Sequence, residues 1–155
     1  MDLIYRWEND PEMWDCSAEH APFSRHRLMD YVMNDGLQDI CASRQLRLVA
    51  MDGEVAVGCV DLYDYEPFHQ RAGVGMLVDA RLRGRGYGKA MLMALTGYCR
   101  RHLLLHQLYC EVAVGNVASR RLFEGCGFVD AGCRKQWLRR PDGWEDACVY
   151  QLILE

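Results

Sequence analysis

The segment of residues 81–90, RLRGRGYGKA, is rich in glycine and arginine and separates two stretches of different hydrophobic period. Residues 71–78 alternate with a period of two, which predicts a strand, and residues 86–102 carry apolar side chains with a helical period. A turn from a strand into a helix presents the free backbone N–H groups of the first helical turn, where the helix dipole favours anions. Arg83 and Arg85 add positive charge at the same place. The segment therefore predicts a phosphate-binding turn.

Phosphate-binding turns of different classes need particular residues at fixed spacing. A P-loop requires Ser or Thr after its Gly-Lys pair, but Gly88-Lys89 is followed by Ala90. A dinucleotide-binding turn requires a third glycine, which neither frame of this segment supplies. The spacing that fits is Arg-x-x-Gly-x-Gly, formed by Arg83, Gly86 and Gly88.

A second pattern follows at residues 109–128, YCEVAVGNVASRRLFEGCGF. It indicates a strand, an Asn at position 116, a short helix and a closing Gly-Phe pair. Together the two patterns resemble the pyrophosphate loop and the second motif of the GNAT superfamily of acetyl-CoA-dependent N-acetyltransferases. The resemblance extends from residues 7–11, WENDP, to the last strand, and is nearest to the branch of ribosomal-protein alanine and spermidine N-acetyltransferases.

The resemblance implies a mixed α/β (α+β) fold in a single domain, residues 1–155. Its central sheet is twisted and mostly antiparallel, contains two adjacent parallel strands that splay apart to admit acetyl-CoA, and is flanked by helices. The patterns predict a hairpin turn at Asp52-Gly53. They predict helices in the first 40 residues and at 86–102 and 116–124, and strands at 45–51, 55–63, 71–78, 107–114, 128–138 and 145–154.

The start of the chain departs from the family pattern. Relatives place a strand before the first helix, whereas this chain begins at that helix. Either the strand is missing, which leaves a sheet edge for a partner to cover, or the recorded start is late. A homodimer is among the expected assemblies.

The resemblance also implies which residues bind acetyl-CoA, the acetyl donor. Backbone groups of Met76, Leu77 and Val78 would meet the pantetheine arm, and Asn116 would contact it as well. Asn116 has a second role open to it, because Asn is a good N-cap for the helix that follows. Phe123, seven residues later, completes the set. The pyrophosphate would lie against Arg83, Gly84, Arg85, Gly86, Tyr87, Gly88 and Lys89.

In the family, a neutral amine attacks the thioester directly in a ternary complex, so positioning supplies much of the rate. The amine must lose a proton. Some relatives use a Glu where this chain has Gly73, and others use a Glu five residues before the Asn, the position of Glu111. We therefore predict Glu111 as the general base, with a solvated strand residue as the alternative. Glu66 and His69 are further candidates for a base that acts through water.

The proton donor for the departing thiolate is open. Relatives often use a Tyr where this chain has Phe123, which cannot donate a proton. Tyr87, Tyr98 and Tyr109 are alternatives among which the spacing does not choose. Because Gly73 and Phe123 remove two familiar catalytic side chains, the competing hypothesis is a non-catalytic acyl-CoA-binding sensor or partner protein.

The acceptor is expected to be a primary amine on a polyamine, a small amine or a protein N-terminus. Acidic side chains on the expected acceptor wall suit a cationic amine, although scattered acids are commonly solvated charge. Gly73 and Gly75 also predict close approach of a ligand or another backbone to their strand. The first helices and the last hairpin would form the wall, with Trp14, Glu19, Asp30, Asp35, Asp39, Trp137, Trp144, Glu145 and Asp146.

The composition argues against several other partners. The 18 Lys and Arg are outnumbered by 22 Asp and Glu, and a net charge of −4 does not favour nucleic acid. No apolar run is long enough to cross a membrane, and the acidic start is no secretory signal, so a cytoplasmic location is expected. The eight cysteines lack the close pairs typical of metal sites, so we predict free thiols, several of them in the core, and no metal.

Overall fold

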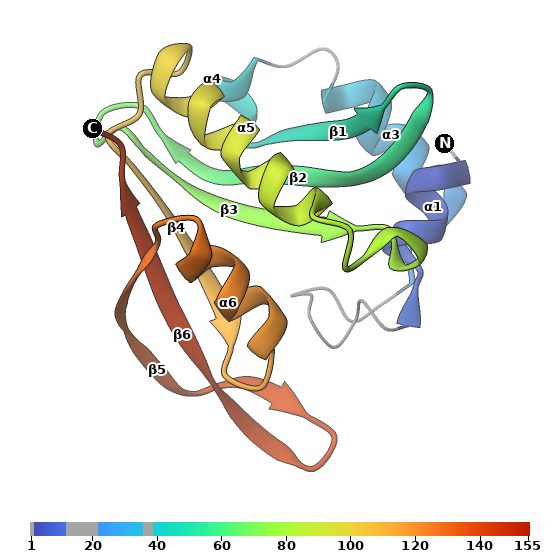
Figure 1. Ribbon diagram of the computed structural model, residues 1–155. Coiled ribbons are helices and arrows are strands. Elements are labelled where there is room, and N and C mark those ends of the chain that lie inside the picture. Colours follow the sequence, from blue (N-terminus) through green and yellow to red (C-terminus); the bar gives the residue numbers. More distant parts are fainter. Residues whose placement is uncertain (1, 12–21, 36–38) are drawn as a thin grey trace.

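The computed structural model describes residues 2–11, 22–35 and 39–155. Its centre is one six-stranded sheet with the order β1-β2-β3-β4-β6-β5, against which the helices lie (Figure 1). The strands are β1 (Leu46–Asp52), β2 (Val55–Glu66), β3 (Arg71–Val78), β4 (Gln107–Ala113), β5 (Val129–Arg140) and β6 (Gly143–Ile153). The helices are α1 (Asp2–Glu8), α3 (Arg25–Asp35), α4 (Ile40–Ser43), α5 (Tyr87–Arg101), α6 (Val117–Gly125) and the short 3-10 helix η1 (Ala80–Leu82).

Neighbouring strands are antiparallel except β3 and β4, which run parallel. These two strands pair over three positions only, from Arg71–Gln107 to Gly73–Tyr109, and separate beyond that point. In Figure 1, β3 and β4 diverge from this paired end, with α5 beside the half that contains β1 to β3 and α6 beside the other half. The predicted fold class, a mostly antiparallel sheet with a splayed parallel pair and flanking helices, is confirmed.

The main core lies between the sheet and helices α5 and α6. Leu108 of β4 and Val74 of β3 are buried in it. The helical period predicted for residues 86–102 is confirmed, although Ala94, which that period places on the apolar face, is exposed. The residues that α5 buries are Met91, Leu92, Leu95 and Cys99.

The other side of the sheet carries different side chains. Because side chains alternate along a strand, Gly73 and Gly75 of β3 face away from the core. The register places Tyr63 and Asp61 of β2 beside these glycines, and Tyr109 of β4 beside Gly73. We call this side, defined by these five residues, the glycine face.

The first hairpin closes with a two-residue loop. Asp52 pairs with Val55, so that Gly53 and Glu54 form the turn, and Gly53 has a φ of 59°, which glycine adopts without strain. The turn is therefore confirmed one residue further along than predicted. The other predicted helices and strands agree with the observed bounds to within about three residues, which is the usual uncertainty of element ends.

The cysteines of the described part of the chain are free thiols, and Cys59, Cys99, Cys110 and Cys148 are buried. Cys16 lies outside the described residues. In the ranges that the structure covers, no group of three or more His, Cys, Asp or Glu side chains could hold a metal ion. None of the helices described there is both long and apolar enough to span a membrane.

Candidate active site

A cavity of about 1490 Å³ lies along the opening between β3 and β4 and reaches the glycine-rich turn, α6 and the glycine face. It brings together nearly all the residues predicted to bind the co-substrate. Arg85 is the exception, because it is exposed and does not line the cavity. The predicted residues in the lining are Met76, Leu77, Val78, Arg83, Gly84, Gly86, Tyr87, Gly88, Lys89, Asn116 and Phe123.

The glycine-rich turn keeps its backbone accessible. Gly84 and Gly86 have φ values of 75° and 87°, and nothing lies within 4 Å of where a Cβ would be at either residue. Gly86 is also the N-cap of α5, and it makes no side-chain hydrogen bond to the first helical N–H groups. Arg83 donates from Nε to the carbonyl of Val78 at 3.3 Å, next to these groups. An open turn, a helix N-terminus and a guanidinium fit a pyrophosphate.

Gly88 has a packing reason to be glycine. A Cβ at this position would lie 3.1 Å from Cδ2 of Leu122, which belongs to α6. The absent side chain lets the start of α5 approach α6 closely. This contact joins the helices that flank the two sides of the splay.

The edge of β3 that faces β4 is open beyond Gly73. From Val74 onward β3 continues to pair with β2, up to the pair of Val78 and Gly58, while its pairing with β4 has ended. Unpaired main-chain groups along such an edge bind extended ligands as an added strand would. Met76, Leu77 and Val78 lie on this edge, so the position predicted for the pantetheine arm has the required geometry.

Asn116 caps α6, as its second predicted role requires. Its Oδ1 accepts a hydrogen bond from the backbone N–H of Ser119 at 3.1 Å. Asn116 also lines the cavity, so the cap holds the residue beside the splay. Contact with the pantetheine stays a prediction.

Phe123 is a core residue at the inner wall of the cavity. Its side chain is buried and meets the ring of Phe128 edge to face, with ring centroids 5.1 Å apart. Apolar packing explains why a Phe is stable at this position. It also leaves α6 without a proton donor here.

Glu111 lies on β4 within the cavity lining, and 27% of its side chain is exposed. Its Oε1 is 3.0 Å from Nη2 of Arg134, whose guanidinium lies 4.6 Å from the ring centroid of Trp137. The carboxylate is therefore held by a partner from β5 and also reaches the cavity. Glu66 and His69 do not line the cavity, which makes them weaker candidates.

The structure distinguishes the three tyrosines that were candidates for the proton donor. Tyr98 packs beside His102 on α5, with ring centroids 5.4 Å apart, and does not line the cavity. Tyr87 lines it but donates its hydroxyl hydrogen to Asp52 at 2.6 Å, which raises the pKa of Tyr87. Tyr109 lines it where the paired part of β3 and β4 ends.

The space beside Gly73 is filled by a side chain, not by a ligand or another backbone. A Cβ on Gly73 would lie 2.1 Å from Cε2 of Tyr63. The prediction that a ligand or another backbone approaches this glycine was therefore wrong. The Tyr63 ring meets Tyr109 edge to face at 5.8 Å, and the Tyr109 hydroxyl donates to Oδ2 of Asp64 at 3.2 Å. A Cβ on Gly75 would have its nearest neighbour, Cβ of Asp61, 3.8 Å away, so the glycine face stays open at this residue.

Arg47 links α1 to the glycine face. Its guanidinium makes two hydrogen bonds to Asp61, at 2.7 and 2.8 Å, and a third to Glu8. Burial lowers the pKa of Arg47, but the hydrogen bonds and charges of the two carboxylates raise it more, so the pKa is higher than usual. Glu8, Arg47 and Asp61 all line the cavity, and the guanidinium offsets one of the two carboxylate charges.

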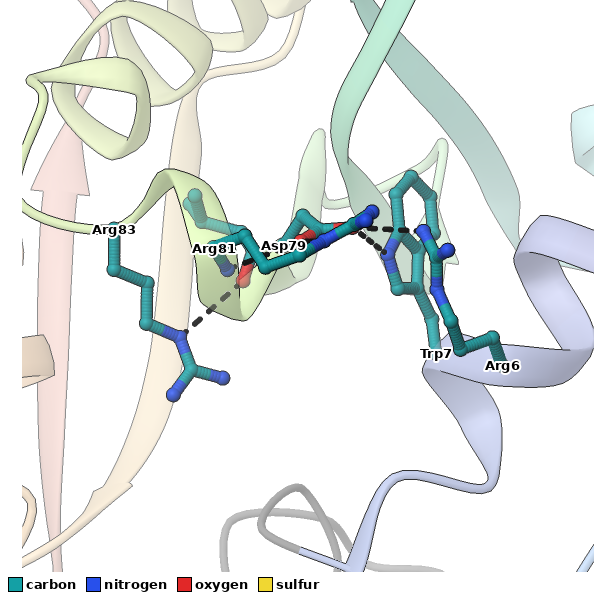
Figure 2. A network of polar contacts seen from close by, with 6 residues as sticks. Arg6, Trp7, Asp79, Arg81 and Arg83 are labelled. Carbon is teal, nitrogen blue, oxygen red and sulfur yellow. Dashed lines mark hydrogen bonds and ion pairs between the residues drawn. The ribbon is translucent and has the colours of Figure 1, made fainter.

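Asp79 joins α1 to the segment that leads into the glycine-rich turn (Figure 2). It accepts hydrogen bonds from Arg81, from Nε1 of Trp7 at 3.0 Å and from Arg6 at 2.9 Å. It is the one buried charged residue in the described ranges. The hydrogen bonds from Arg81 and Trp7 hold the pKa of Asp79 well below its usual range, despite burial.

Comparison with known proteins agrees with this geometry. A family model described as the acetyltransferase (GNAT) domain matches residues 1–129. The chain belongs to the GNAT acetyltransferase family. The predicted family is confirmed by this membership, and the matched domain is an acetyltransferase domain.

Similar proteins lie in the spermidine branch of the GNAT family. Spermidine N(1)-acetyltransferase of Vibrio cholerae is 26% identical over 112 residues, which are 72% of this chain and 63% of that protein. The structure of Vibrio cholerae spermidine N-acetyltransferase in complex with CoA and spermine has a TM-score of 0.88 at 21% identity, over 99% of this chain and 89% of the other. A dodecameric structure of that enzyme in an intermediate state has a TM-score of 0.82 at 21% identity, over 99% and 87%. The structural likeness shows that the two proteins share a fold over 99% of this chain.

The acidic wall predicted for the acceptor is not assembled as expected. Trp14, Glu19 and the side chain of Asp35 lie outside the described part of the structure. Of the others, only Trp137 lines the cavity. Asp39 caps α4, Asp30 lies 3.4 Å from His26, Trp144 is exposed, and Glu145 and Asp146 pair with Arg140 and Lys135.

Among the described residues, the acids that line the cavity are Glu8, Asp61, Asp64 and Glu111, of which only Glu111 was predicted. A sequence signal for Asp64 exists in the spacing of apolar residues. Leu62 and Tyr65 are both buried although they are three positions apart, which breaks the alternation of a regular strand. Such a break is the mark of a bulge.

Proposed function

We propose that this chain transfers the acetyl group of acetyl-CoA to a primary amino group of a spermidine-type polyamine, in the cytoplasm. The observation that carries this proposal is the splay of β3 and β4, which opens to the glycine-rich turn and to a face lined by carboxylates. The spermidine acetyltransferases among its relatives favour a polyamine over other amines. Free buried thiols such as Cys99 suit the reducing cytoplasm.

The donor side of the cavity would bind the co-substrate through its backbone. Gly84, Gly86 and the first turn of α5 would hold the pyrophosphate, with Arg83 and Lys89 as its cations. The open edge of β3 at Met76 to Val78 would hold the pantetheine arm, beside Asn116 and Phe123.

Acetyl-CoA supplies an activated acetyl group as a thioester. The residues of this chain hold the amine against it from the glycine face, so that transfer needs no covalent enzyme intermediate. Glu111 accepts the proton that the amine loses, from a position on β4 beside the opening. Arg134 keeps this carboxylate oriented. The apolar Phe123 takes no part in proton transfer.

A CoA-release assay across an amine panel tests the proposal, with mass spectrometry to identify the acetylated product. The panel contains spermidine, spermine and 1,4-diaminobutane, together with amino acids, aminoglycosides and peptides with free N-termini. We expect release with the polyamines. Release only with peptides would overturn the acceptor class but not the transfer. Tight acetyl-CoA binding without release for any amine would instead identify an acyl-CoA-binding protein without activity.

A further inference from the structure

The charges of the cavity carboxylates are balanced unequally. Glu8 and Asp61 both bind Arg47, and Glu111 pairs with Arg134. Asp64 differs, because its hydrogen-bond partner in the described structure is the neutral hydroxyl of Tyr109 at 3.2 Å. It makes no ion pair with a described residue, and its side chain is exposed to the cavity. This anionic position is therefore free to take a cation from a ligand.

Tyr109 stays a neutral partner for Asp64. Burial raises the pKa of Tyr109, and the nearby Asp64 charge and hydrogen bond raise it further, to about 12, against the opposing charge of Arg71. The phenol therefore stays protonated at neutral pH and donates a hydrogen bond to the carboxylate. It orients Asp64 without cancelling its charge.

The backbone of β2 directs Asp64 into the cavity. The register shifts between Tyr63 and Glu66, and Asp64 has a φ of 49° in the left-handed region. A bulge of this kind turns a side chain away from the direction that strand alternation gives it. Here it places a carboxylate beside Tyr109, where the opening between β3 and β4 begins.

The position of Asp64 relative to the reaction follows from the strand register. Tyr109 pairs with Gly73 at the closed end of the splay, and Glu111, the proposed base, is two residues further along β4 on the same face. Two residues of a strand span about 6.6 Å. An acceptor amine at Glu111 therefore has Asp64 and Tyr109 to one side of it. The distance from the amine to these two side chains is roughly the length of a short aliphatic diamine.

We propose that Asp64, oriented by Tyr109, binds the second, non-reacting ammonium group of a diamine or polyamine acceptor. This inference rests on the proposed function and assigns its preference for polyamines to one side chain. The reacting nitrogen is held near Glu111, and the ion pair at Asp64 fixes which end of the acceptor enters. Monoamines lack the group that Asp64 recognises.

The test compares two acceptors of equal length, 1,4-diaminobutane and butylamine, in the wild type and in Asp64→Asn. Asn is the suitable replacement because it tolerates a positive φ and still accepts the Tyr109 hydrogen bond. We expect kcat/KM for the diamine to fall about 10- to 100-fold, the range of one hydrogen bond to a charged group, mostly through KM. The value for butylamine should stay unchanged.

Glu54→Gln provides the control. Glu54 is exposed in the turn of the first hairpin, outside the cavity, and this variant removes the same unit of charge. It should leave the ratio of diamine to monoamine kcat/KM at the wild-type value. An equal loss on both acceptors in Asp64→Asn would contradict recognition of the second ammonium, as would no loss on either.

A titration keeps this inference separate from the proposed function. 1,4-Diaminobutane is titrated into the CoA-bound wild type and the CoA-bound Asp64→Asn variant, and the heat of binding is measured without turnover. We expect the variant to bind the diamine at least about tenfold more weakly. If the wild type releases no CoA with any amine, the transfer proposal fails and this titration still decides the role of Asp64. Equal diamine affinities, or no diamine binding to the wild type, would overturn the inference.

Discussion

At the scale of single residues, the ion pair of Glu111 and Arg134 bears directly on catalysis. Glu111→Gln keeps the size of the side chain and a hydrogen-bond acceptor for Arg134 but removes the basic carboxylate. If Glu111 takes the amine proton, kcat should fall by about 10²- to 10⁴-fold, the usual contribution of a general base. Binding of acetyl-CoA, measured by calorimetry, should be unchanged.

The rates for this variant are measured with spermidine from neutral to alkaline pH. The control is Asp142→Asn, which removes a carboxylate from the exposed turn between β5 and β6. Turnover of Glu111→Gln equal to that of the wild type at every pH would exclude Glu111 as the base. The carboxylate would then be a solvated strand residue held by its arginine.

Some site residues could be predicted from the sequence because their chemistry is local. The turn from Arg83 to Lys89 and the cap at Asn116 depend on spacing within one strand-to-helix or loop-to-helix junction. Asp64 could not be placed in the same way, since a bulge sets its direction. Glu8 reaches the cavity through Arg47, 39 positions further along the chain, and no local pattern shows such a pair.

At the scale of elements, Asp79 joins α1 to the connection between β3 and α5. Asp79→Asn removes a buried charge from three donors, of which Arg81 and Arg6 are cationic. The loss of one hydrogen bond to a charged group is about 1.5–3 kcal/mol, and we expect the free energy of unfolding at neutral pH to fall by this amount. Urea unfolding measures it, with Asp142→Asn as the exposed control.

The pH dependence of the stability difference between wild type and Asp79→Asn gives a further check. Because the pKa of Asp79 is lowered in the folded state, its contribution is fully present above the unfolded value, about 3.9. It is lost as the pH falls from there through the folded pKa. The difference between wild type and Asp79→Asn should therefore shrink below about pH 4. A difference that is constant with pH would show that packing, and not charge, ties α1 to the sheet.

The glycine-rich turn is tested by a pair of matched glycines. Gly86 and Gly53 both have positive φ values, 87° and 59°, and both have open space where a Cβ would be. Alanine at either position costs about 1–2 kcal/mol of backbone strain. Only Gly86 opens a helix beside the proposed pyrophosphate site. Gly86→Ala should raise the Kd for acetyl-CoA about tenfold or more, and Gly53→Ala should leave it unchanged.

Calorimetric titration of acetyl-CoA into both variants measures this difference, with thermal unfolding as the check that both lose similar stability. Equal Kd values in the two variants would mean that the turn does not bind the co-substrate.

The elements themselves were well predicted, because hydrophobic period and turn residues are local. The end of β2 was not, because its bulge continues the strand to Glu66.

At the scale of the whole molecule, the two halves of the sheet are joined by only three pairs between β3 and β4. One core nevertheless spans both halves, and it contains Cys99 of α5 and Cys110 of β4, both with at most 1% of their surface exposed. Burial raises the pKa of each thiol to about 12. Neither thiol should therefore react with iodoacetamide in the folded protein at neutral pH, because alkylation needs an accessible thiolate.

Labelling of these two thiols should then report how the halves separate. If they become accessible only by global unfolding, acetyl-CoA at 100 times its Kd adds about 2.7 kcal/mol and slows labelling about 100-fold at both positions. Mass spectrometry of the alkylated peptides measures each rate, and the exposed Cys41 of α4 provides a thiol whose rate acetyl-CoA should not change. If the splay instead opens locally, Cys110 beside it would label faster than Cys99, and one cooperative unit would be excluded. Equal protection of both thiols would mean that the co-substrate stabilises the two halves of the sheet as one unit, although it enters between β3 and β4, where the halves separate.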